Sequence, residues 1–178
     1  MYVVEIRKMS EAFALRRLVR GDAEAYRRIR LEALAQHPES FSASLEDETA
    51  QPLVSYERRI LMSEVFGGFR GTELMGIARF SIEPGAKRRH IGVLTGMYVR
   101  EAARGTGLAS ALVEHVIAAA KTRVERLNLT VTASNTRALR LYQRHGFRIY
   151  ATEGNALKVG GRYYDEHLMT RVLRTGAG

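Results

Sequence analysis

Apolar and polar residues follow two different periods along this chain, which predicts both helices and strands. Between residues 105 and 123, apolar side chains recur at helical spacing, while Ser110, Glu114 and Lys121 lie on the opposite side. This amphipathic stripe predicts a helix over 105–123. Residues 127–133 instead alternate between apolar and polar side chains, which is typical of a strand with one buried face.

Similar patterns, together with turn and capping residues, predict the remaining elements. Asp22 is a suitable N-cap for the first long helix, and Gly146 is a common stop for the last one. Residues 39–52 are acidic and serine-rich, and we expect them to form a loop. Further helices are expected over 23–36, 54–63 and 135–145, and further strands over 13–18, 65–70, 74–82, 90–99, 147–158 and 162–173.

The order of these elements defines the expected fold class. A strand–helix–strand unit in the middle predicts a parallel pair, and the hairpins on either side predict antiparallel pairs. We therefore expect an α/β protein of the α+β type, with a single mixed, mostly antiparallel sheet of six to seven strands and helices on both faces. The length of 178 residues fits one domain over 1–178, with a loose segment at 1–12 and a frayed tail at 174–178.

Composition then excludes several classes of function. The chain has no cysteine, so it holds no disulfide, no thiolate nucleophile and no cysteine-ligated zinc or iron–sulfur site. Its net charge of +9 favours an anionic partner, such as a nucleic acid, an acidic membrane or a polyphosphate cofactor. The arginines are spread along the chain, however, and no nucleic-acid-reading motif is present, so we expect no nucleic-acid partner.

The sequence also carries no pattern typical of export or of a membrane span. Glu5 stands where a signal peptide would have its apolar core. The longest apolar stretch, 109–120, is interrupted by Glu114 and His115, and it is too short to cross a bilayer. We therefore expect a cytoplasmic protein without a membrane partner.

A glycine-containing turn before the longest helix is the first candidate for chemistry. After a strand that ends near Val99, the sequence runs Arg104-Gly105-Thr106-Gly107-Leu108-Ala109. The first N–H groups of a helix have no intrahelical partner, and glycines let an anion approach the backbone closely. Neither a Walker loop nor a Rossmann fingerprint fits this string, since Ser110 replaces the third Rossmann glycine. On its own, a glycine-rich helix start without a ligand explains the turn equally well.

A second motif changes this interpretation. The string Asn-x-x-Ala-x-x-Leu-Tyr-x-x-x-Gly-Phe runs from Asn135 to Phe147, after the alternating strand. Together with the pattern Arg104-x-x-Gly107-x-Ala109, it resembles the GNAT superfamily of acyl-CoA-dependent N-acetyltransferases. The segments 37–41 and 161–169 are also similar to this family, and the resemblance spans about residues 13 to 173. It implies the acyl-CoA N-acyltransferase fold and acetyl-CoA as co-substrate, with no metal.

The resemblance also implies roles for particular residues. A phenol can protonate the departing CoA thiolate, and Tyr142 is the candidate general acid, although a tyrosine buried in the core would fit the same position. A backbone N–H near Tyr98 could stabilise the oxyanion. Asn135 caps its helix and is also a candidate for binding the pantetheine. The candidate cofactor-binding residues are Met97, Tyr98, Val99 and Asn135 for the pantetheine arm, and Arg104, Gly105, Thr106, Gly107, Leu108 and Ala109 for the pyrophosphate.

The general base stays open. Many family members place a glutamate on the fourth strand, but residues 90–99 contain no carboxylate. The remaining candidates are Glu46, Asp47, Glu48, Glu83 and water. His90, His145 and His167 are expected to be structural, no spacing suggests a metal site, and Ser110 has no sequence context for a hydrolase triad.

The function expected from these observations is transfer of an acetyl group from acetyl-CoA to a primary amine of a small molecule or peptide. The alternatives are another acyl group on the same scaffold and a non-catalytic CoA-binding or interaction module. The missing fourth-strand glutamate favours the module, while Tyr142 favours the enzyme. The acceptor stays open, and the resemblance allows a homodimer.

Overall fold

The computed structural model describes residues 13–174, in which seven strands form one sheet covered by helices. The expected loose segment 1–12 and all but the first residue of the expected tail lie outside the described residues. The helices are α1 (Ala23–Gln36), α2 (Leu45–Thr49), α3 (Leu53–Met62), α4 (Leu108–Lys121) and α5 (Thr136–Arg144). The strands are β1 (Ala14–Arg17), β2 (Glu64–Arg70), β3 (Glu73–Ile82), β4 (Ile91–Val99), β5 (Arg126–Thr132), β6 (Arg148–Val159) and β7 (Arg162–Val172).

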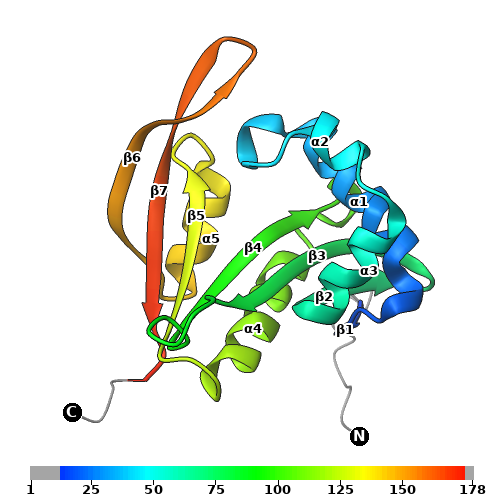
Figure 1. Ribbon diagram of the computed structural model, residues 1–178, viewed down its shortest axis with the longest axis horizontal. Helices are drawn as coiled ribbons and strands as arrows, with labels where there is room; N and C mark the ends of the chain where they lie inside the picture. The colour runs from blue at the N-terminus through cyan, green and yellow to red at the C-terminus, as the bar shows by residue number, and fades with distance from the viewer. Residues whose placement is uncertain (1–12, 175–178) are drawn as a thin grey trace, which may run out of the picture.

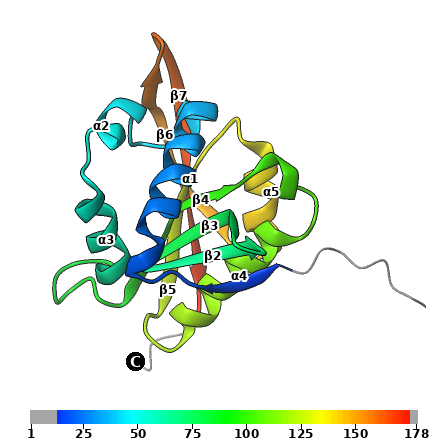
Figure 2. The same ribbon diagram turned by 90° about the vertical axis from the view of Figure 1, so that its right-hand side faces the viewer.

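The sheet is mixed and mostly antiparallel, which confirms the predicted fold class. Its strand order is β1-β2-β3-β4-β5-β7-β6, and β4–β5 is the one parallel pair among the described strands. Helices α1 to α3 cover one face, and α4 and α5 cover the other (Figures 1 and 2). The β6–β7 hairpin extends beyond the body of the sheet (Figure 1).

Each face of the sheet has its own apolar core. Leu112, Val113 and Val116 of α4 are fully buried on one face, and Tyr26 and Tyr56 are buried on the other. Burying a side chain of this size contributes about 1.5–3 kcal/mol. These two cores hold the sheet rigid between the helices that position the loops.

The two central strands separate, and this separation creates the space for a site. Strand β4 pairs with β5 only at the three residues from Ile91 to Val93, and beyond them the strands diverge (Figure 1). The pairing of β4 with β3 shifts register between Thr95 and Tyr98, and Gly96 within this bulge has a φ of +62°. Because a bulge bends its strand, and because glycine adopts a positive φ at little cost, Gly96 turns β4 away from β5.

The structure corrects three sequence predictions, which concern one loop and the starts of two helices. Residues 39–52 are not one loop, since α2 forms there with the Ser44 side chain accepting from the Asp47 N–H. Asp22 occupies the N-cap position of α1, as predicted, but its side chain does not cap the helix, because its carboxylate binds Arg16 and the Val19 N–H instead. Helix α4 begins at Leu108 and not at residue 105, since the preceding glycines have left-handed backbone conformations.

Candidate functional site

A cavity of about 580 Å³ occupies the gap where β4 and β5 diverge. It is bordered by the loop after α1, the end of β4, the turn before α4 and the start of α5. Most of the residues that the sequence predicts for cofactor binding line this cavity. They are Met97, Tyr98, Val99, Arg104, Gly105, Gly107, Ala109 and Asn135.

The glycine turn presents its backbone to this cavity. Gly105 and Gly107 have φ values of +79° and +91°, and a Cβ added at either position would meet no atom within 4 Å. Thr106 and Leu108 do not line the cavity. The Thr106 hydroxyl donates to the Ala103 carbonyl, and the Leu108 side chain is buried. The turn therefore offers main-chain N–H groups to a ligand, in an orientation that glycine permits.

Arg104 is held in a fixed position at the edge of the cavity. Its Nε donates to the Val99 carbonyl at 3.1 Å, and its Nη2 lies 2.9 Å from His37 Nε2. Arg137 and Arg144 of α5 line the same cavity. Among the described residues, Glu39 is the one carboxylate that lines the cavity beside these three cations, so the cavity favours an anionic ligand.

Tyr98 and Asn135 contribute to the cavity from opposite walls. The Tyr98 hydroxyl lies 2.9 Å from a carboxylate oxygen of Glu32 and 2.8 Å from the Gln36 side-chain oxygen. Burial, followed by the hydrogen bond to Glu32, raises the pKa of Tyr98 to about 12. Asn135 Oδ1 accepts from the Ala138 N–H at 3.1 Å, which confirms the predicted helix cap and leaves its amide nitrogen for a ligand.

Tyr142 is buried beside the cavity and does not line it. Its ring packs edge-on against Phe147 at 5.9 Å, whereas Ala138 and Leu141 of the same helix do line the cavity. Burial raises the pKa of Tyr142 above its ordinary value. Its hydroxyl makes no hydrogen bond to another residue in the described part of the chain. The role of Tyr142 as a general acid stays a prediction.

None of the four carboxylates proposed from the sequence as a base lines the cavity. Glu48 is buried, with Oε1 at 2.5 Å from Arg59 Nη1. Burial alone would raise its pKa, but the hydrogen bond from Arg59 and the charge of Arg30 outweigh burial and hold the pKa of Glu48 below its usual value. Asp47 accepts from the Ser44 hydroxyl, and Glu83 pairs with Arg88. Glu46 is exposed on α2.

Two features of the cavity wall escaped the sequence analysis. Glu39 lies 3.8 Å from His37 Nδ1, and both residues belong to the segment 37–41 that resembles the family. Ser110 Oγ lies 2.7 Å from His145 Nε2, although the two residues are far apart in sequence. Burial lowers the pKa of His145, which keeps its ring neutral at pH 7. No carboxylate hydrogen-bonds to His145 among the residues that the structure describes, so the pair lacks the third member of a triad.

Residues 13–174 contain no group of three or more histidine, cysteine, aspartate or glutamate side chains placed to hold a metal ion. They also contain no helix that is long and apolar enough to span a membrane.

The chain matches the model of the Acetyltransferase (GNAT) family over residues 24–147, which is more than half of its length. The protein therefore belongs to the GNAT acetyltransferase family. This match includes the glycine turn, the β4–β5 gap and the whole of α5.

Similar proteins agree with this assignment. The L-amino acid N-acetyltransferase AaaT of Escherichia coli (strain K12) is 29% identical over 102 residues, which are 56% of this chain and 62% of that protein. The chain thus aligns with less than two thirds of that relative. A GNAT-family acetyltransferase from Streptococcus pneumoniae has the same fold, with a TM-score of 0.81, 24% identity and coverage of 90% and 99% of the two chains. The yncA protein of Salmonella typhimurium, solved with its cofactor acetyl-CoA, gives a TM-score of 0.79 at 21% identity, with coverage of 94% and 97%.

Proposed function

We propose that this protein transfers an acetyl group from acetyl-CoA to a primary amine of a small molecule or peptide. The observation that carries the proposal is the opening of one cavity both to the β4–β5 gap and to the glycine turn. A long ligand with a phosphate at one end and a reactive group at the other matches this shape. Acetyl-CoA is such a ligand, and a structural relative carries it.

The phosphate end of acetyl-CoA fits the turn before α4. The pyrophosphate would accept hydrogen bonds from main-chain N–H groups between Gly105 and Ala109, where the helix dipole adds positive potential. Arg104, Arg137 and Arg144 add positive charge around this end of the cavity. The left-handed backbone at Gly107 brings the chain close to the ligand without a side chain in between.

The pantetheine arm fits the divergent part of β4. Beyond Val93 the β5-facing main-chain groups of β4 have no partner on β5, and Met97, Tyr98 and Val99 line the gap. An amide-bearing arm would hydrogen-bond to these groups as an added strand would. Asn135 lines the same cavity, and its amide nitrogen would bind the arm from the α5 side.

Transfer then requires three events in the same cavity. The amine nitrogen attacks the thioester carbon, and a main-chain N–H near Tyr98 would stabilise the oxyanion that forms. The carbon–sulfur bond breaks, and the CoA thiolate takes a proton. Tyr142 is the proposed donor, because a phenol is protonated at neutral pH and its hydroxyl is not engaged by another described residue. The amine loses its proton to water or to Glu39, the carboxylate within the cavity lining.

Release of CoA from acetyl-CoA, measured across a library of primary amines, tests this function. Turnover that depends on both acetyl-CoA and an amine is the expected result. Binding of acetyl-CoA without turnover of any amine would instead assign the chain to the non-catalytic CoA-binding alternative. Absence of acetyl-CoA binding by calorimetry would contradict both.

A further inference from the structure

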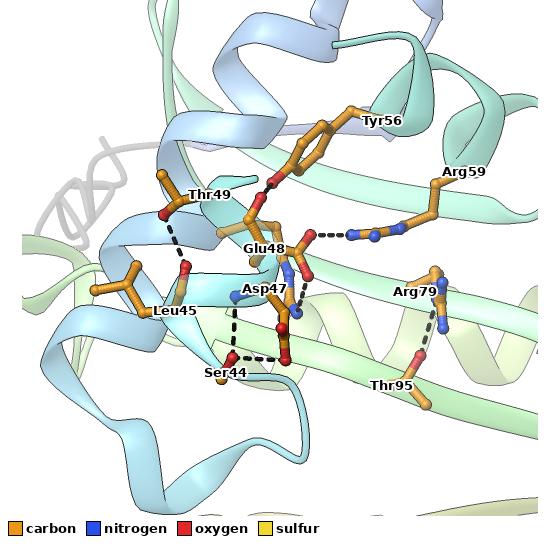
Figure 3. A network of polar contacts seen from close by, with 10 residues as sticks. Ser44, Leu45, Asp47, Glu48, Thr49, Tyr56, Arg59, Arg79 and Thr95 are labelled. Carbon is orange, nitrogen blue, oxygen red and sulfur yellow. Dashed lines mark hydrogen bonds and ion pairs between the residues drawn. The ribbon is translucent and has the colours of Figure 1, made fainter. Parts of the chain in front are cut away.

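A cluster of arginines lies on the face of the sheet that is covered by α1, α2 and α3. It consists of Arg30 from α1, Arg59 from α3 and Arg79 from β3, and we call these three residues the arginine cluster. Figure 3 shows Glu48 of α2 reaching toward Arg59, with Arg79 and Thr95 beside them. Four elements, α1, α2, α3 and β3, therefore bring their charged side chains together here.

The charges of this cluster are not balanced. Glu48 contacts Arg59 at 2.5 Å and Arg30 at 3.6 Å, so one carboxylate serves two guanidinium groups. Arg79 makes a hydrogen bond to the Thr95 hydroxyl at 2.9 Å and has no carboxylate partner in the described part of the chain. Its burial lowers the pKa of Arg79, which is the direction expected for a cation that lacks a counter-charge.

Arg30 is the arginine of the cluster with the most unpaired donors. Its side chain is 8% exposed, and its Nε and Nη1 have no hydrogen-bond partner among residues 13–174. Buried donors are nearly always satisfied in folded proteins, because leaving them unpaired is costly. The two unpaired donors lie on different edges of the guanidinium, so they favour a nearby negative charge without forming a two-pronged contact with one carboxylate.

The arginine cluster lies next to the cavity in the β4–β5 gap, at the β4 bulge. A Cβ added at Gly96 would lie 3.6 Å from Arg30 Nη1, and the next residue, Met97, lines the cavity. The Phe41 ring, which also lines the cavity, lies 5.3 Å from the Arg30 guanidinium. Thr95, the partner of Arg79, precedes the bulge on the same strand, and so it lies on the side of Met97 away from the glycine turn.

A second cavity reaches the cluster from the α3 side. Its volume is about 420 Å³, and Arg59 and Arg79 line it together with Arg58 and three serines. In the part of the chain that the structure describes, no carboxylate lines this second cavity. The cluster therefore lies between an open, cationic cavity and the part of β4 where the acetyl group would be presented.

We propose, given the function proposed above, that the acceptor amine also carries a carboxylate, as an amino acid does, and that Arg79 binds this carboxylate where the charge of Arg30 adds to the attraction. Binding supplies the missing negative charge to the cluster. It also orients the acceptor with its amine toward the β4 bulge. An acceptor without a negatively charged group leaves the positive charge of the cluster unbalanced, and the arginines add nothing to its affinity.

Matched pairs of acceptors test this specificity. Glycine and the neutral or basic L-amino acids with a primary α-amine have the same side chains and α-amines as their primary amides, but the amides lack the α-carboxylate. We expect kcat/KM for CoA release to be at least about tenfold higher for the preferred acids than for their amides, since charged hydrogen bonds account for a factor of this size. The amides have the less basic amines and hence more of the reactive unprotonated form, so intrinsic reactivity predicts the opposite order. Equal or better use of the amides would overturn the proposal.

Substitution of Arg79 tests whether this residue causes the preference for acids over amides. Arg79→Gln should raise KM for the acids by about 10- to 100-fold and leave KM for the amides and the affinity for acetyl-CoA unchanged. Arg79→Lys should recover part of the loss. Arg148→Gln, which removes the same charge at an exposed position on β6, is the matched control and should change none of these values. An equal loss for acids and amides in Arg79→Gln would contradict a carboxylate site.

Calorimetric titration gives a measurement that does not depend on turnover. The same acid–amide pairs are titrated into the complex of the protein with CoA. If the acids bind more tightly than the amides, and Arg79→Gln weakens their binding, the carboxylate site is supported. This result would hold even if no amine is acetylated, and in that case only the proposed acetyl transfer would be contradicted. Equal affinities for acids and amides would refute the site while leaving acetyl transfer to other amines intact.

Discussion

Gly107 combines a left-handed backbone with an open position at the cavity. Gly107→Val should abolish acetyl-CoA binding, because the side chain would occupy the space of the pyrophosphate and strain the turn at a φ of +91°. The strain costs about 1–3 kcal/mol, and no neighbouring atom clashes with an added Cβ, so the protein should stay folded. Titration calorimetry of acetyl-CoA measures the effect.

Gly85→Val is the matched control for this substitution. Gly85 has a φ of +88° in an exposed turn away from the cavity, and an added Cβ there also meets no atom within 4 Å. The control should lose similar stability and keep its affinity for acetyl-CoA. If Gly107→Val binds acetyl-CoA as tightly as Gly85→Val, the turn is not the phosphate site.

Substitution of Tyr142 distinguishes a catalytic role of this residue from a structural one. If its hydroxyl protonates the CoA thiolate, Tyr142→Phe should lower kcat by roughly ten- to a thousandfold, within or just below the usual range for general acids. The affinity for acetyl-CoA should change little, because phenylalanine keeps the edge-on contact with Phe147. Steady-state kinetics and urea denaturation of the same variant distinguish the two roles. A variant with normal kcat would show that water, and not Tyr142, protonates the thiolate.

Single residues also show where sequence analysis succeeds and where it ends. The turn from Gly105 to Ala109 is a local pattern, and its position on the cavity followed from the strand and helix on either side of it. Arg30 carried a local signal too, since it lies on the otherwise apolar stripe of α1 with Tyr26 and Ala33. Its neighbours Arg59 and Arg79 belong to other elements, however, and no local pattern indicates that they meet.

At the scale of elements, periodicity predicted nearly every helix and strand, whereas the loop expected over 39–52 contains α2. That helix is short, and what fixes it is tertiary contact: Glu48 binds Arg59 of α3 and Arg30 of α1, and its carbonyl accepts from the Tyr56 hydroxyl at 3.0 Å. An acidic segment is usually a solvated surface, so the burial of Glu48 could not be read from composition.

The contacts of Glu48 with α1 and α3 predict a large effect of its removal. Glu48→Ala should destabilise the protein by about 3–5 kcal/mol, because two arginines in or near the core lose their counter-charge. Glu46→Ala, on the exposed side of the same helix, is the control and should stay within about 0.5 kcal/mol of the wild type. Urea denaturation at pH 7 measures both. A small loss for Glu48→Ala would mean that α2 is not anchored by its ion pairs.

The lowered pKa of Glu48 also predicts how stability depends on pH. A carboxyl group whose pKa is lower in the folded state stabilises that state above its ordinary value of 4.5 and loses the contribution as the pH falls through the folded pKa. The difference in unfolding free energy between wild type and Glu48→Gln should therefore shrink below pH 4.5. A difference that stays constant from pH 7 to pH 3 would contradict this linkage.

At the scale of the whole molecule, the arrangement of the sheet determines where a ligand acts. The cavity lies between the half of the sheet that carries α1 to α3 and the half formed by β5, β7 and β6, and the short β4–β5 pairing joins these halves (Figure 1). A ligand in the gap would add the contacts that β4 and β5 do not make with each other. Binding of acetyl-CoA should therefore stabilise the fold as a unit.

Ligand linkage gives the size of this stabilisation. At a hundredfold excess of acetyl-CoA over its Kd, the free energy of unfolding should rise by about 2.7 kcal/mol, which raises Tm by roughly 5–10 °C for a protein of this length. Thermal denaturation with and without acetyl-CoA measures the shift, and Gly107→Val, which should not bind it, serves as the control. The shift should also shrink as salt screens the arginines around the phosphate end of the cavity. A wild-type Tm that does not change at millimolar acetyl-CoA would contradict the assignment of the β4–β5 gap as the cofactor site, since binding to the folded state alone must stabilise it.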